Sequence, residues 1–153
     1  MKPLPIALLL ALAAAAPAAL AASGSMEVVR PWSRPAAAGT NGVGYMVVVN
    51  HGHAADALEK VESPIAARVE MHASSMAGGI MTMRRMDRIP IPAGGRVTFG
   101  PGAYHLMLVG LTRTLKAGDE APVTLRFASG AKVAARLAVT AGLGPPGADG
   151  AAP

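Results

Sequence analysis

The 153-residue sequence contains no cysteine, and only 3% of its residues are aromatic and 15% are charged. Without cysteine the chain has no disulfides and no thiolate that acts as a nucleophile or metal ligand. The scarcity of aromatic residues means that valine, leucine, isoleucine and methionine must build the core. Although the net charge is +5, the basic residues are scattered and stacking aromatics are few. We therefore expect no nucleic-acid binding.

The N-terminal residues have the composition of a secretory signal peptide. Lys2 precedes an apolar run over residues 4–12, and small residues end the segment at Ala21 and Ala22. Residues 1–22 are therefore predicted to be a cleaved signal peptide and not a membrane anchor, since Pro17 and the small residues do not suit a spanning helix. No cysteine lies near the cleavage point, so a lipid anchor is not expected. The mature protein is predicted to be exported, soluble and not membrane-spanning.

Short strands separated by glycine, proline, asparagine and aspartate are predicted over residues 23–140, with no competing long amphipathic helix. This length suits one domain. Ser129 and Gly130 are typical of a hairpin turn, and the pattern favours an all-β sandwich or barrel. Residues 141–153, rich in glycine, proline and alanine, are predicted to be a disordered tail. The nine expected strands are 26–30, 43–50, 57–62, 68–72, 81–86, 96–99, 105–111, 123–128 and 132–140.

The stretch from residue 72 to 107 holds two of the four histidines and five of the nine methionines. His72, Met83, His105 and Met107 follow the spacing H-x10-M-x21-H-x-M. Residues two apart on a strand share a face, so His105 and Met107 should project together, and a neighbouring strand can bring the other two beside them. Imidazole and thioether donors suit Cu(I), whereas harder cations prefer oxygen. The spacing predicts a Cu(I) site, and the alternative is that these methionines fill gaps in the core.

Two further groups, a pair of histidines and a basic cluster, are candidate sites outside this stretch. His51 and His53 lie in a turn and are expected to be solvated, since no third metal ligand accompanies them. The basic cluster of Arg84, Arg85 and Arg88 is expected to be a solvated edge, or alternatively a docking patch for an acidic partner.

Four further methionines surround the predicted ligands: Met71, Met76, Met81 and Met86. Met71 should point away from His72 into the core. Met81 shares a face with Met83 and is a candidate to line the site or to substitute for Met83 as a ligand. Met76 is expected in a flexible loop over residues 74–79, and a docking or capture role is the alternative to packing there.

The sequence resembles the periplasmic copper chaperones of the PCuAC family over residues 26–140. The resemblance rests on the spacing H-x10-M-x21-H-x-M and on four further segments, which are 31–34 (PWSR), 44–50 (GYMVVVN), 91–95 (IPAGG) and 101–111 (PGAYHLMLVGL). It implies a cupredoxin-like Greek-key β-barrel or sandwich in the periplasm. It also implies that His72, Met83, His105 and Met107 hold one Cu(I) at an exposed end.

The function that the resemblance implies is delivery of copper to the CuA centre of cytochrome c oxidase subunit II, alongside a Sco-type protein. Two alternatives stay open: a periplasmic copper-buffering or resistance protein, and a non-metal β-sandwich interaction module. A blue-copper carrier is excluded by the absence of cysteine. An enzyme is not expected, because four protein ligands leave a metal no open position. Copper affinity should weaken as the pH falls toward and below about 6.5, where imidazole is protonated.

Overall fold

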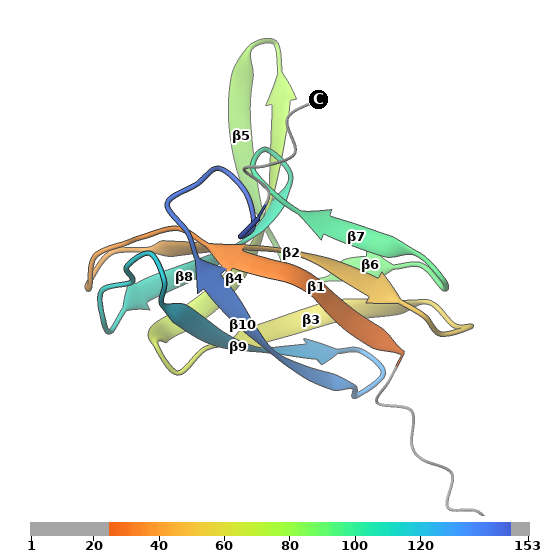
Figure 1. Cartoon of the computed structure of the whole chain (residues 1–153). Helices are drawn as coiled ribbons and strands as arrows, with labels where there is room; N and C mark the ends of the chain where they lie inside the picture. Colours follow the sequence, from red (N-terminus) through yellow and green to blue (C-terminus); the bar gives the residue numbers. More distant parts are fainter. Residues whose placement is uncertain (1–24, 148–153) are drawn as a thin grey trace, which may run out of the picture.

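Ten β-strands and no helix make up residues 25–147, the part of the chain that the computed structural model describes. They form one strongly coiled sheet in the order β5-β4-β8-β7-β2-β1-β10-β9-β3-β6 (Figure 1). This confirms the predicted all-β fold. The strands are β1 Met26–Ser33, β2 Gly42–Asn50, β3 Asp56–Glu62, β4 Ala66–Ala77, β5 Ile80–Met86, β6 Ile89–Ile91, β7 Arg96–Phe99, β8 Tyr104–Leu111, β9 Glu120–Phe127 and β10 Lys132–Val139.

Alternation of apolar residues along the strands builds the core. In β9, every second residue from Ala121 to Phe127 is buried, as the two-residue period of a strand requires. The sheet brings together strands that are distant in sequence: β1 pairs with β10 in parallel, β3 with β9, and β4 with β8. Because β3 also lies against β4, the sheet closes around one apolar core. Its fully buried members include Met46, Val48, Leu58, Ile89, Ile91, Leu106, Leu108, Leu125 and Leu137.

A glycine permits the close packing beside β8, the strand that carries the predicted His-x-Met pair. Gly44 lies opposite Leu106 in the β2–β8 register. A Cβ atom at Gly44 would lie 2.9 Å from Leu137 Cδ1, closer than packed carbon atoms come, and 3.2 Å from Leu106 Cβ, which is tighter than most packed contacts. The absence of a side chain at Gly44 therefore sets how closely the core packs beneath β8.

The hairpin of β4 and β5 projects away from the rest of the sheet (Figure 1). Its turn consists of Gly78 and Gly79, with φ angles of 58° and 78°. Positive φ at both positions suits a tight two-residue turn that matches the twist of the strands. The tip is exposed on both strands, and six of the seven residues of β5 are exposed. This hairpin is a projecting arm and not part of the core.

Two strand predictions need correction. The segment 74–79 was expected to be a flexible loop, but β4 continues to Ala77, because its second half pairs with β5 residue by residue. The Ser75 and Thr82 hydroxyl groups, 2.9 Å apart, link the two strands there. The edge strand β6 was not predicted because Pro90 interrupts it, although Ile89 and Ile91 are both fully buried.

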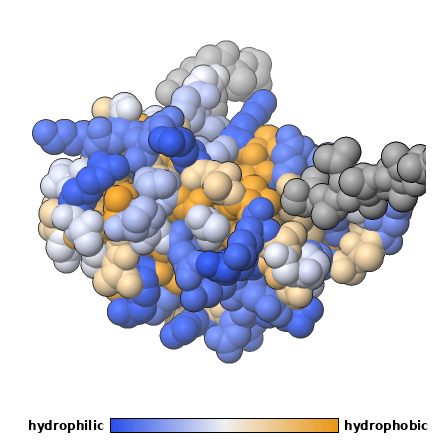
Figure 2. Space-filling model, turned by 90° about the horizontal axis from the view of Figure 1, so that it is seen from below, coloured by the Kyte–Doolittle hydropathy of each residue, from blue (hydrophilic) through white to orange (hydrophobic). Residues whose placement is uncertain are grey.

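The predicted turn at Ser129 and Gly130 is confirmed, since it joins β9 to β10. The predicted signal peptide lies outside the described residues, as do residues 148–153; residues 141–147 form bends and turns. Among residues 25–147, none belongs to a helix long and apolar enough to cross a membrane. The face seen in Figure 2 is mostly hydrophilic, with apolar side chains gathered in a patch near its centre.

Candidate metal site

The two predicted histidine ligands lie side by side on neighbouring strands. His72 of β4 is directly opposite His105 of β8 in the antiparallel register. Their ring centroids are 5.5 Å apart, with the ring planes inclined at 59°. Only 14% of the His72 side chain is exposed, and His105 is 5% exposed as a residue. The structure therefore brings together residues that are distant in sequence, and it shields both imidazoles from solvent.

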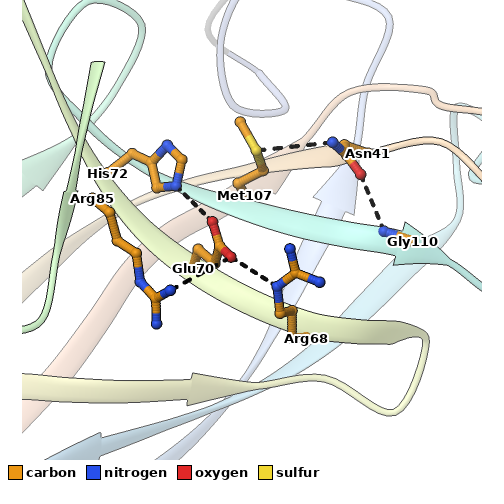
Figure 3. A network of polar contacts seen from close by, with 7 residues as sticks. All are labelled: Asn41, Arg68, Glu70, His72, Arg85, Met107 and Gly110. Atoms are coloured by element: carbon orange, nitrogen blue, oxygen red, sulfur yellow. Dashed lines mark hydrogen bonds and ion pairs between the residues drawn. The ribbon is translucent and has the colours of Figure 1, made fainter.

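Met107 lies on the same face of the sheet as the histidine pair. It follows His105 by two residues on β8 and is opposite Glu70 of β4. The Asn41 side chain amide donates a hydrogen bond to the Met107 sulfur over 4.0 Å, and the Asn41 carbonyl oxygen accepts one from the Gly110 backbone over 3.1 Å (Figure 3). Asn41 therefore connects the thioether to the backbone of β8 and restrains it beside the histidines.

Met83 lies on the projecting arm, opposite a residue of β4 that is two positions from His72. It is opposite Ser74 on β4, so it shares a face with His72 and is its diagonal neighbour. Such diagonal neighbours are about 7–8 Å apart, within the reach of long side chains. Met83 is 58% exposed. Three of the four predicted donors are thus gathered on β4 and β8, while the fourth, on β5, lies at the solvent-exposed end of the same face.

Glu70 is a residue at this site that the sequence analysis missed. Its carboxylate accepts hydrogen bonds from His72 Nε2 over 2.9 Å and from Arg68 Nε over 2.7 Å, and it lies 3.9 Å from Arg85 Nη1 (Figure 3). The hydrogen bonds from Arg68 and then His72 lower the pKa of Glu70 to about 2. Glu70 precedes His72 by two residues and therefore shares its face of the strand, a signal that the sequence does contain.

The carboxylate determines which nitrogen of His72 is available to a metal. A hydrogen bond from Nε2–H to Glu70 places the proton on Nε2 and leaves the lone pair on Nδ1. This Nδ1 is buried and has no hydrogen-bond partner among residues 25–147. A buried, unpaired nitrogen on the face that also carries the thioethers of Met107 and Met83 matches the donor chemistry of a soft cation. The residues present therefore fit a Cu(I) ion.

His105 has the complementary arrangement. Its Nδ1 lies 3.4 Å from the carbonyl oxygen of Ala103, so Nδ1–H donates and Nε2 keeps its lone pair. Burial lowers the pKa of His105 below its ordinary value, and the nearby His72 acts in the same direction. The neutral, metal-binding form of His105 is therefore favoured by its surroundings.

The other residues considered in the sequence analysis lie elsewhere or have structural contacts. His51 Nε2 is 2.6 Å from Glu27 Oε2, and His53 lines a surface hollow of about 420 Å³ near the end of β2 remote from β8. The residues lining this hollow include none of the four predicted donors. Arg88 lies 3.7 Å from Glu59. Met71 is 4% exposed and packs in the core, as predicted.

Comparison with known proteins agrees with this fold. Residues 26–139 match the family described as "Putative lipoprotein LpqE-like". The chain belongs to this LpqE-like family. A curated relative, "Putative lipoprotein Lxx21020" of Leifsonia xyli subsp. xyli, is 31% identical over 106 residues, covering 69% of this chain and 63% of the relative. The chain thus spans less than two thirds of that relative.

Solved PCuAC structures share the fold of this LpqE-like chain. The copper-bound PCuAC domain from PmoF2 is 32% identical, with a TM-score of 0.65 over 78% of this chain and 95% of that domain. The Cu(I) form of DR1885 from Deinococcus radiodurans is 25% identical, with a TM-score of 0.59 over 81% of this chain and 85% of that protein. The predicted cupredoxin-like fold is confirmed, and the similarity supports a PCuAC-like domain.

Proposed function

We propose that the protein is a metallochaperone that carries one Cu(I) between His72, Met83, His105 and Met107. The observation that carries this proposal is the buried His72–His105 pair, in which each ring has one nitrogen without a proton and Met107 lies on the same face. The similarity to copper-bound PCuAC structures supports copper as the cargo.

Residues that contact the proposed ligands keep them in position to bind Cu(I). Glu70 fixes the ring orientation and tautomer of His72, and Asn41 restrains the sulfur of Met107. Met83, on the exposed arm, supplies a donor that an incoming partner can replace first. Neutral imidazole and thioether donors hold Cu(I) without a thiolate, so an acceptor richer in thiolates can take the ion. The proposed role is therefore that of a carrier and not of an enzyme.

The acceptor we propose is the CuA centre of cytochrome c oxidase subunit II, with a Sco-type protein acting alongside. We further propose that residues 1–22 are removed on export and that the mature domain, residues 23–140, works in the periplasm with residues 141–153 as a disordered tail. The relatives are described as putative lipoproteins. This sequence contains no cysteine, the residue that would carry a lipid, so we propose a soluble form.

Transfer of copper to an isolated CuA domain tests the proposal. The mature protein, loaded anaerobically with one Cu(I), is mixed with the apo domain, and the copper content of each is measured after separation. A chaperone passes its copper to the domain faster than the ion dissociates from the loaded protein into solution. A copper buffer keeps the ion, and an interaction module takes up none at the start. Protein with His105→Ala, which lacks one proposed ligand, is the control for loading.

A further inference from the structure

The projecting arm concentrates exposed methionine. Met76, Met81 and Met83 are 64%, 53% and 58% exposed, respectively. Methionine usually fills gaps in an apolar core, but none of these three side chains is buried in one. Exposing three large apolar side chains on one hairpin makes no contribution to folding stability, because stabilisation by apolar residues comes from their removal from water. Their positions therefore call for a role other than packing.

The strand register places all three sulfur-bearing side chains on the face that carries the histidine pair. Met76 is directly opposite Met81, and Met83 is opposite Ser74 in the next row. The row after that contains Arg85 opposite His72, which in turn is opposite His105. Successive rows on one face are two residues apart, or about 7 Å. The thioethers therefore form a track about 14 Å long from the tip of the arm to the histidines.

We propose that Met76, Met81 and Met83 form a thioether site that captures Cu(I) at the tip of the arm and passes it to the histidine pair. This inference rests on the proposed function and adds a second binding site to it. Three neutral thioethers are soft donors that bind Cu(I) and leave harder cations in solution. Because they are exposed, they meet incoming copper before the shielded imidazoles do.

Met83 is the donor that the two sites share. Copper first held by Met76, Met81 and Met83 keeps its bond to Met83 while the lone pairs of the two imidazoles replace the sulfurs of Met76 and Met81. Each exchange replaces one neutral donor with another, so copper remains Cu(I) and no proton is released. The direction of transfer follows from the donors, since imidazole nitrogens held in place by Glu70 and Ala103 lose less freedom on binding than mobile thioethers.

A kinetic experiment tests the capture step in a protein with an intact histidine site. Met76→Leu/Met81→Leu removes two sulfurs and conserves volume. Met86→Leu is the matched control, because Met86 belongs to the same strand but is opposite the buried Met71 on the other face. Uptake of Cu(I) from a coloured chelator complex is followed by loss of the chelator absorbance. The double variant should take up copper more slowly than wild type and reach the same final affinity, whereas the control should match wild type.

A binding experiment isolates the arm. In His72→Ala/His105→Ala, Ag(I) serves as a redox-stable probe, and NMR follows the methionine methyl groups. Ag(I) should shift the methyl signals of Met76, Met81 and Met83, and the shift of the Met83 signal should be lost when Met76→Leu/Met81→Leu is added. The kinetic experiment keeps His72 and His105 intact and therefore tests the capture step independently of how the double histidine variant folds.

Equal uptake rates in wild type and Met76→Leu/Met81→Leu would overturn the inference and leave the arm as an apolar docking surface for a protein. Failure of the proposed function looks different, because wild type would then bind no Cu(I) that depends on His105. Failure of the capture site alone leaves that binding intact.

Discussion

Replacing Glu70 tests whether the carboxylate positions His72 for copper. The Glu70 side chain is 14% exposed, and its Oε2 lies 2.9 Å from His72 Nε2, so the carboxylate orients the ring through a hydrogen bond that is largely shielded from solvent. Removing a hydrogen-bond partner behind a metal ligand typically weakens metal binding about 10- to 100-fold. We expect Glu70→Ala to fall in that range and Glu70→Gln, which keeps an acceptor oxygen, to lie near its lower end.

The assay is an anaerobic Cu(I) titration against a chromophoric chelator, together with 15N NMR of the histidine rings. Glu70→Ala should also redistribute the proton of His72 between its two nitrogens. Arg68→Ala is the control, since it removes a neighbour of Glu70 on the exposed side and leaves the bond to His72. Its effect on affinity should stay below about fivefold, as for exposed ion pairs. Unchanged affinity and an unchanged His72 tautomer in Glu70→Ala would refute the assigned role.

Three further predictions concern stability. Gly44→Ala should lower the free energy of unfolding by about 1–3 kcal/mol, because the added Cβ would lie 2.9 Å from Leu137 Cδ1. Gly100→Ala is the control, since a Cβ there would have no neighbouring atom within 4 Å, and its free energy of unfolding should stay within about 0.5 kcal/mol of wild type. Asn50→Ala should cost about 1–3 kcal/mol in urea denaturation, since it leaves two carbonyl groups without their side-chain donor; an unchanged midpoint would contradict this. Burial lowers the pKa of His105, so as the pH falls His105 is protonated in the unfolded chain before it is protonated in the folded protein. The neutral His105 ring therefore contributes its full stability above pH about 6.5, and the free energy of unfolding declines below that pH. A thermal midpoint that does not fall between pH 7 and 5 would contradict that sign.

The sequence was informative about the fold where one periodicity dominated. The alternation in β9 and the turn residues Ser129 and Gly130 were sufficient to predict a hairpin of the sheet. The arm was harder, because small and polar residues in the second half of β4 lack an apolar period. That half is a strand because of its partner β5, and such pairing is a tertiary effect that a local pattern does not contain. The edge strand β6 was missed for a different reason, because Pro90 stands between Ile89 and Ile91 and proline argues against a strand.

For the candidate site, spacing predicted that His105 and Met107 share a face, and the register of β4 with β8 then placed His72 beside them. The sequence analysis considered only soft donors and therefore overlooked Glu70, which acts on a ligand and not on the metal. Asn41 was beyond its reach, because the contact with Met107 joins residues 66 positions apart. Such contacts depend on how the sheet closes.

X-ray absorption spectroscopy of the mature protein with one equivalent of Cu(I) tests the proposed site most directly. We predict a first shell of mixed nitrogen and sulfur, with nitrogen scattering reduced in His105→Ala and sulfur scattering reduced in Met107→Leu. A shell without sulfur, or a spectrum that neither variant changes, would contradict copper binding by the histidine pair and its neighbouring thioethers.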